Sequence, residues 1–302
     1  MGPADADGGW ARSSDDVGQR RLSEGALLQG DRKKRRGTIE GLAMSLSIPP
    51  MVQKLQTALH AKAKQSPSLR FYALYDKVYR TDVLQYAYAR CRANGGAAGV
   101  DGVTFEQVES EGVESWLGGL AEQFRNKTYC PQAVRRVMIP KSNGGERPLG
   151  IPTVADRVVQ MAAVLVLEPI FEADLLPEQH AYRPGRSALG AVIATHKLVN
   201  TGHREVVDAD LSGYFDSIPH EPLLKSVARR VSDGSMPHLI KMWLQMPVEE
   251  EDDRGRRHRT TLPPECVHAE FTNIRHGLVS GGKVTPMSKF PEKYAEYKKS
   301  DA

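Results

Sequence analysis

Apolar residues recur along this chain with two different periods, which predict helices joined to a few short strands. In several segments the apolar positions return every three or four residues, the spacing of one helix face. Other segments are short β-branched runs bounded by glycine-rich turns, which are typical of strands. Helical patterns are found at 50–93, 105–124, 154–173, 188–200, 219–231 and 237–246. The alternation of helix, hairpin, helix, strand and helix indicates an α+β fold.

The segment from Ala133 to Pro152 predicts a β-hairpin. Its two apolar runs flank Ser142-Asn143-Gly144-Gly145, which is a strong turn sequence. Lys141 stands at the entrance of the turn and Arg147 at its exit. Cationic ends suit a polyphosphate, because lysine supplies a point charge and arginine a bidentate fork. A solvated basic hairpin without a ligand is the alternative.

Candidate metal chemistry lies in the segment from Glu205 to Asp216. A β-branched run carries Asp208 and Asp210 toward a small-residue turn. A strand that ends in a carboxylate beside a turn is one way to hold a divalent cation. Either Asp210 is a metal ligand for phosphoryl or nucleotidyl transfer, or both aspartates are ordinary strand-end and turn residues. A hydrolase that uses both is less favoured, because no His or Glu nearby has metal-ligand spacing.

Two loops carry residue types that suit contact with a nucleic-acid backbone. Asn94 to Gly102 is glycine-rich, which predicts either a flexible turn or a backbone that closely approaches a phosphate. Tyr182 to Ser187 places two arginines around a Pro-Gly pair, where they could grip a backbone while Tyr182 stacks on a base. A nucleic-acid-binding role is predicted for four arginines on the hairpin and this second loop: Arg135, Arg136, Arg183 and Arg186.

Composition is compatible with a nucleic-acid partner without requiring one. The 302 residues carry a net charge of +4, and the basic residues gather in clusters. No apolar run reaches the ~18 residues of a membrane helix, so no membrane partner is expected. Three scattered cysteines favour reduced thiols in a cytoplasmic protein. Residues 1–47 lack an apolar period and are rich in Gly, Ser, Asp and Arg, which predicts a disordered basic tail.

Four segments, taken in this order and spacing, resemble the reverse transcriptases and maturases encoded by bacterial group II introns. They are Asn94–Thr104, Ile139–Thr153, Tyr182–Ser187 and Val207–His220. The resemblance covers the chain from Pro49 to Thr261. It implies a right-hand polymerase in which residues 48–204 form the fingers and residues 205–261 an incomplete palm. The helices would then surround the basic hairpin and the short acidic strand.

The resemblance also implies roles for individual residues in RNA-directed DNA synthesis. Asp210 would be the catalytic aspartate that binds both Mg²⁺ ions, and the backbone carbonyl of Leu211 would join the metal shell. Phe215 would lie under the sugar and exclude the 2′-hydroxyl of a ribonucleotide. Lys141 and Arg147 would hold the incoming triphosphate. The implied partners are group II intron RNA, primer DNA and dNTPs.

The chain departs from the family pattern after the acidic strand. Two Mg²⁺ ions need carboxylates from more than one strand, and the family supplies them from an aromatic-x-Asp-Asp turn. Here the Asp-Asp pairs are Asp15-Asp16 and Asp252-Asp253, and neither follows an apolar strand. Residues 262–302 show no period and no family likeness, which predicts an unrelated, disordered tail. We therefore expect a truncated chain that does not polymerise. A non-catalytic RNA-binding protein is the alternative.

Overall fold

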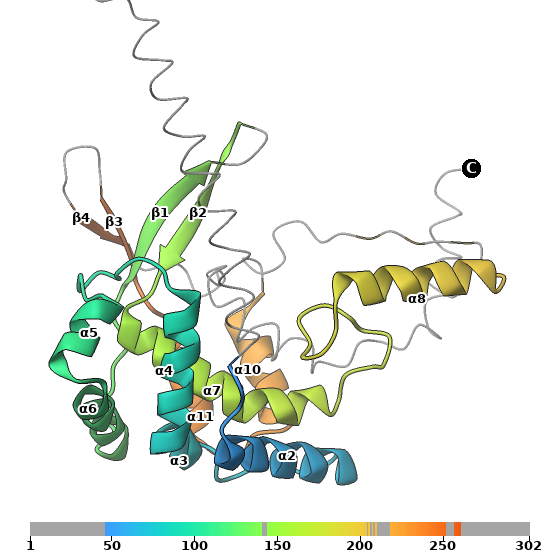
Figure 1. Ribbon diagram of the computed structural model, residues 1–302, viewed down its shortest axis with the longest axis horizontal. Coiled ribbons are helices and arrows are strands. Elements are labelled where there is room, and N and C mark those ends of the chain that lie inside the picture. Colours follow the sequence, from blue (N-terminus) through green and yellow to red (C-terminus); the bar gives the residue numbers. More distant parts are fainter. Residues whose placement is uncertain are drawn as a thin grey trace, which may run out of the picture. The chain divides into compact units, whose positions relative to one another are not determined.

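The computed structural model describes residues 46–140, 144–203, 205, 207, 209, 218–251 and 257–260. The helices and strands that it describes lie in one compact unit, Ile48–Ala302. In chain order they are α2 (Pro50–Gln65), α3 (Tyr75–Val78), α4 (Thr81–Asn94), α5 (Phe105–Glu111), α6 (Val113–Arg125), β1 (Val134–Pro140), β2 (Glu146–Ile151), α7 (Val154–Glu172), α8 (Ala188–Asn200), α10 (His220–Ala228), α11 (Ser235–Leu244), β3 (Val248–Glu251) and β4 (Arg257–Thr260) (Figure 1). Among the described residues, no helix has the length and apolar character needed to span a membrane.

Three predicted helix starts are confirmed by side-chain caps. The hydroxyl of Thr104 accepts a hydrogen bond from the backbone N–H of the third residue of α5, and a reciprocal glutamine bond completes a capping box. Thr153 caps α7 and Ser187 caps α8 in the same way. Each cap satisfies a backbone N–H that has no partner within the first helical turn.

Two predicted helices are interrupted. The pattern at 50–93 breaks between α2 and α3, where Ser66 precedes Pro67 and its backbone is no longer helical (φ −132°, ψ 83°). Proline disfavours a helical conformation at the residue before it, and it lacks the N–H that a helix interior requires. The pattern at 105–124 divides at Gly112, whose φ of 101° suits glycine and ends α5 before α6 begins.

The predicted hairpin is confirmed, and it belongs to a larger sheet than the sequence indicated. β1 and β2 pair antiparallel, with Ile139 opposite Arg147. β3 pairs parallel to β1, and β4 pairs antiparallel to β3, so the strand order is β2-β1-β3-β4. β3 and β4 were missed because they are short and charged. The fold of the described part is therefore α+β with a small mixed sheet.

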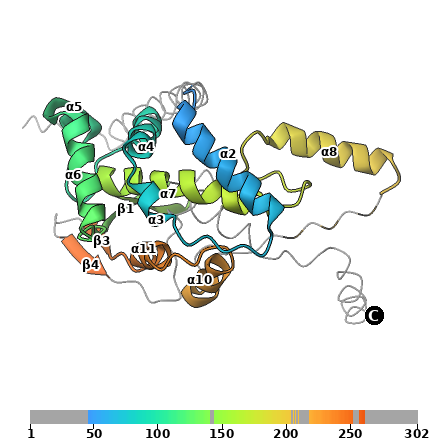
Figure 2. The same cartoon turned by 90° about the horizontal axis from the view of Figure 1, so that it is seen from below.

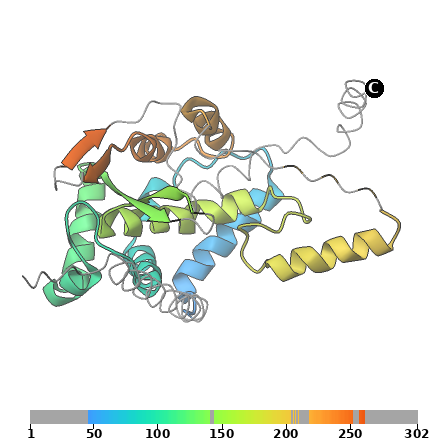
Figure 3. The same ribbon diagram turned by 90° about the horizontal axis from the view of Figure 1, so that it is seen from above.

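α7 is the central helix of the core. α2 and α4 pack across it on one side, while α10 and α11 lie on the other (Figures 2 and 3). Val158, Ala162 and Val166 are fully buried in α7. Small and β-branched side chains allow neighbouring helices to approach closely, which suits a helix that is packed on several sides.

Arg230 and Asp233 join the end of α10 to the segment between α2 and α3. The guanidinium of Arg230 donates to the carbonyl oxygens of Ala63, Ser66 and Pro67, and its Nε lies 3.1 Å from the Asp174 carboxylate. The carboxylate of Asp233 accepts from two backbone N–H groups at the start of α3. These bonds satisfy carbonyls and N–H groups that helix ends leave without partners.

A buried polar network joins the base of β1 to α7 and α11. The hydroxyl of Tyr129 donates to the Asp156 carboxylate at 2.6 Å and accepts from the indole N–H of Trp243 at 3.3 Å. Asp156 also accepts from the Thr153 hydroxyl and from the backbone N–H of Gln132. Burial and the charge of Asp156 raise the pKa of Tyr129, so its hydroxyl stays protonated and acts as the donor.

α8 packs differently from the other long helices. None of its described side chains is buried, and apolar residues such as Leu189, Val192 and Ile193 are more than half exposed. Its capped start was predictable from Ser187, whereas its exposure was not. A helix of this composition normally buries one face.

Candidate nucleic-acid-binding surface

The register of β1 and β2 sorts the hairpin side chains onto two faces. Opposed residues of antiparallel strands point to the same face, and the faces alternate along each strand. Arg135 and Arg147 therefore share one face, and the opposed pair of Val137 and Leu149 lies between them. Arg136 lies on the other face. We call the four residues Arg135, Val137, Arg147 and Leu149 the hairpin face.

Arg147 is the exposed cation at the outer end of the hairpin face. It lies opposite Ile139, next to the turn, and no ion pair is found for it in the described part of the chain. Lys141 follows β1 directly in the sequence but lies outside the described residues. The exposed guanidinium of Arg147 can therefore offer its donors to an anionic ligand.

The two neighbouring arginines of β1 differ in their surroundings. The guanidinium of Arg136 forms an ion pair with Glu250 of β3 at 2.8 Å. Arg135 lies opposite Glu249 in the parallel pair, and Glu249 is itself 3.5 Å from Arg257 of β4. The charged strand β3 thus partly neutralises this basic pair, and more so for Arg136. A nucleic-acid-binding role for both arginines stays a prediction.

The glycine-rich loop is held against the start of α7 by Arg157. Its guanidinium donates to the carbonyl oxygens of Gly95 at 3.2 Å and Ala97 at 2.8 Å, and lies 5.2 Å from the ring centre of Phe105. Burial lowers the pKa of Arg157, and the nearby charge of Arg135 lowers it further. Arg157 thus ties the glycine-rich loop to α7 at the end of β2. Sequence reasoning missed Arg157, because an arginine in a first helical turn has no special signature.

Gly99 lies where the loop comes closest to the backbone between β2 and α7, and only glycine fits there. A Cβ built on Gly99 would lie 2.7 Å from the backbone N and Cα of Thr153. Those are backbone atoms at the junction of β2 and α7, and they cannot swing aside as a side chain could. The loop is thus a fitted segment beside the hairpin base, and not a free linker.

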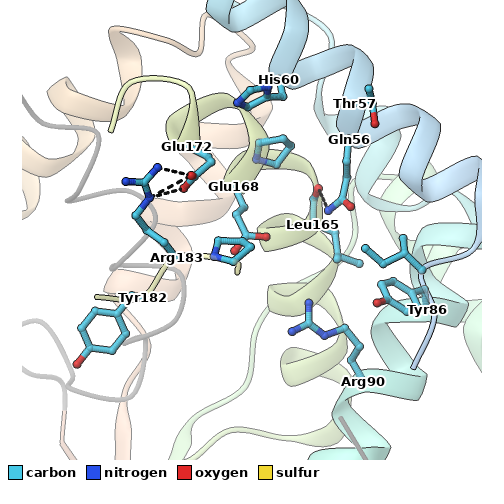
Figure 4. A pocket seen from close by; sticks show the side chains of 13 residues that line it. Gln56, Thr57, His60, Tyr86, Arg90, Leu165, Glu168, Glu172, Tyr182 and Arg183 are labelled. Carbon is cyan, nitrogen blue, oxygen red and sulfur yellow. Dashed lines mark hydrogen bonds and ion pairs between the residues drawn. The ribbon is translucent and has the colours of Figure 1, made fainter. Parts of the chain in front are cut away.

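The loop at 182–187 uses its first arginine within the protein. Arg183 forms an ion pair with Glu172 at 2.6 Å (Figure 4). It also donates to the carbonyl oxygens of Leu176 and Gln179. Its side chain is only 9% exposed. Arg186 is exposed, and Tyr182 is 65% exposed with a φ of 59°. These contacts give Arg183 a structural role, whereas Arg186 and Tyr182 are exposed to solvent.

The predicted metal and sugar-contacting residues are not in the described part of the chain. Asp208, Asp210, Leu211 and Phe215 lie outside it, as Lys141 does. Within the described ranges, no group of three or more His, Cys, Asp or Glu side chains could hold a metal ion. Their predicted roles stay predictions.

Comparison with known proteins shows which family and relatives the sequence resembles. Residues 139–274 match the family described as reverse transcriptase (RNA-dependent DNA polymerase). Protein YkfC of Escherichia coli is 37% identical over 198 residues, covering 63% of this chain and 51% of that protein. The group II intron-encoded protein LtrA of Lactococcus lactis is 34% identical over 176 residues, 58% of this chain and 29% of that protein. The chain thus spans about half the length of the first relative and less of the second.

More distant likeness extends to plants and to a solved structure. Nuclear intron maturase 2 of Arabidopsis thaliana is 34% identical over 93 residues, covering 31% of this chain and 12% of that protein. A solved Cas6-RT-Cas1–Cas2 complex has a TM-score of 0.42 at 19% identity, covering 69% of this chain and 21% of that one. That score is too low to support an inference about this chain.

Proposed function

Because this chain belongs to the family of reverse transcriptases and maturases encoded by group II introns, we propose that residues 48–204 form the fingers and bind single-stranded RNA, and that residues 205–261 form an incomplete palm. The bound strand would run over the hairpin face and the glycine-rich loop. Arg147 and Arg135 would contact phosphates, while the exposed Val137 and Leu149 give an apolar surface for a sugar or base.

The observation that carries this proposal is the shared face. Arg135 and Arg147 point to the same face from two strands, and the glycine-rich loop approaches the base of the hairpin at Thr153. Cations on a single face can follow one phosphate backbone, whereas Arg136 on the opposite face is paired with Glu250. The opposed apolar pair between the two arginines would not be needed for a purely solvated hairpin.

Synthesis of DNA on RNA is the activity of the family, and the roles that individual residues of this chain would have in it are part of the proposal. Reverse transcriptases use Mg²⁺, and by resemblance Asp210 and Leu211 would hold it, Phe215 would face the sugar, and Lys141 and Arg147 would bind the triphosphate. The metal ligands lie outside the described residues, so their roles rest on the resemblance. The aromatic-x-Asp-Asp turn is absent from the 302 residues. We therefore expect RNA binding by this polypeptide without primer extension.

The binding experiment uses the full chain, a labelled single-stranded RNA and a series of salt concentrations. Each phosphate contact on a single strand contributes about −0.7 to the slope of log K against log salt. Arg147→Ala should weaken binding and reduce the slope by about that amount. Arg70→Ala is the matched control, because Arg70 is an exposed arginine in the loop between α2 and α3, away from the sheet (Figure 1). Equal losses in both variants would contradict the assignment of the hairpin face.

The polymerase arm uses the same protein with Mg²⁺, a primed RNA template and labelled dNTPs. The expected result is no extension under conditions in which the template is bound. Robust extension would show that ligands for the second metal are present after all.

A further inference from the structure

A pocket separate from the hairpin face lies between α2, α4, α7 and the loop at 182–184. Its volume is about 520 Å³, within the usual range for small-ligand sites. Its polar lining includes His60, Arg90, Glu168 and the ion pair of Glu172 with Arg183 (Figure 4). Nothing in the proposed binding of RNA by the hairpin face uses these side chains.

The charges in this pocket do not suit a phosphate. Arg183 is already neutralised by Glu172, and Glu168 offsets Arg90. A phosphate placed here would meet two carboxylates together with the two guanidinium groups. The pocket instead suits a ligand without net charge that offers both donors and acceptors.

Glu168 and Arg90 are the groups that such a ligand would meet. Both side chains point into the pocket, from α7 and α4 respectively (Figure 4). They affect one another electrostatically, yet no ion pair within 4.0 Å joins them in the part of the chain that the structure describes. Glu168 has no hydrogen-bond donor there either. Burial raises the pKa of Glu168, while the nearby charge of Arg90 lowers it. A ligand that supplies two N–H groups would give this carboxylate the donors that it lacks among the described residues.

We propose that the pocket binds one unstacked guanine base of a single-stranded RNA. The carboxylate of Glu168 would accept from N1–H and the exocyclic amine, while Arg90 would donate to O6 and N7. Arginine to O6 and N7 is the commonest specific contact to guanine, and a carboxylate matches two adjacent donors. The ring of Pro184 lines one side of the pocket, where it could contact the face of the base. This inference rests on the proposed binding of RNA and adds a base preference to it.

Guanine fits this donor and acceptor arrangement better than the other bases. Adenine and cytosine each offer one exocyclic amine to Glu168, and uracil offers a single ring N–H. The loss of one partner from a bidentate contact lowers affinity by about tenfold. Inosine lacks the exocyclic amine of guanosine, and 7-deazaguanosine lacks N7. The two analogues therefore test Glu168 and Arg90 separately on the unmodified protein.

The experiment measures binding of the full chain to short uridine oligonucleotides that carry one central guanosine, adenosine, inosine or 7-deazaguanosine. The guanosine oligonucleotide should bind about tenfold more tightly than the adenosine one, and each analogue should lose most of that gain. Glu168→Gln should remove the preference, because an amide pairs better with adenine. Glu122→Gln is the control, since it removes an exposed carboxylate on α6. Equal binding of all four oligonucleotides, or a preference unchanged in Glu168→Gln, would overturn the proposal.

The design separates this proposal from the proposed function. RNA binding that is sensitive to Arg147→Ala but indifferent to the central base refutes the guanine pocket and leaves the hairpin face standing. If no oligonucleotide binds, the hairpin proposal fails, and free guanosine is then tested by ligand-observed NMR. Guanosine binding that is lost in Glu168→Gln would support the pocket, and no binding would reject it. If Glu168→Gln does not fold, the analogue series on the unmodified chain decides.

Discussion

Replacing Tyr129 with phenylalanine removes one hydroxyl from the centre of the buried polar network. That oxygen is the donor to Asp156 at 2.6 Å and the acceptor for the indole N–H of Trp243 at 3.3 Å. The phenyl ring of the variant occupies almost the same volume, so packing around it changes little. The expected effect is therefore one of hydrogen bonding, and it should appear as a loss of folding free energy.

The magnitude follows from the two broken bonds. A hydrogen bond to a charged group contributes about 1.5–3 kcal/mol, and Asp156 keeps its bonds from Thr153 and Gln132, so its loss lies toward the lower end. The indole N–H of Trp243 is left without a partner in a side chain that is 1% exposed, which costs about 1–3 kcal/mol. Tyr129→Phe should therefore lower the free energy of unfolding by about 2.5–4.5 kcal/mol.

Urea unfolding followed by tryptophan fluorescence measures this loss. The midpoint should fall while the dependence of the free energy on urea concentration stays the same. Tyr72→Phe is the matched control, because the Tyr72 side chain is 77% exposed and its hydroxyl meets water. It should change stability by less than about 0.5 kcal/mol. A Tyr129→Phe protein as stable as the control would refute the network as a source of stability.

Three further predictions test other parts of the described structure. Gly99→Ala should destabilise the protein by about 1–3 kcal/mol and make the glycine-rich loop more sensitive to proteolysis, because the new Cβ would clash with the backbone of Thr153. Its control is Gly118→Ala on α6, where the Cβ has open space, and this change should be neutral or stabilising. Arg183→Met should lower stability by about 2–4 kcal/mol by leaving Glu172 without its partner, seen as a lower melting temperature. Burial raises the pKa of Asp156 above 3.8, so the folded state holds that proton more tightly than the unfolded state. The Asp156 carboxyl should therefore make the free energy of unfolding fall as pH rises from below 3.8 through the pKa of the folded state. Urea titrations at a series of pH values measure this dependence, and Asp156→Asn should remove it.

The parts of the fold that are determined by residues close together in the sequence could be predicted from it. The caps at Thr104, Thr153 and Ser187 act within one helical turn, and the hairpin follows from a turn sequence between two apolar runs. In contrast, β3 and β4 read Val-Glu-Glu-Glu and Arg-His-Arg-Thr, which carry no apolar alternation. Their pairing depends on β1, and nothing local to either strand indicates it.

In the candidate site, too, some residues could be predicted from the sequence and others could not. Arg147 was expected at the end of the hairpin, and the register places it there on the same face as Arg135. Arg183 was expected to face a nucleic acid, yet most of its side chain is buried against Glu172. Residue type cannot separate these cases, because an arginine donates equally well to a phosphate, a carboxylate or a backbone carbonyl. The same ambiguity hid Arg157.

The parallel pairing of β1 with β3 has a consequence for the order in which this protein folds. The ion pair between Arg136 and Glu250 spans 114 residues of sequence, and the bond from Arg230 to Ala63 spans 167. During synthesis, the hairpin emerges from the ribosome long before β3, so the edge of β1 that later pairs with β3 stays unpaired until then. Closing such long loops lowers the entropy of the chain before the stabilising contacts form, and this slows folding. We expect the nascent chain to need protection, by a chaperone or by an RNA already bound to the hairpin, until β3 arrives.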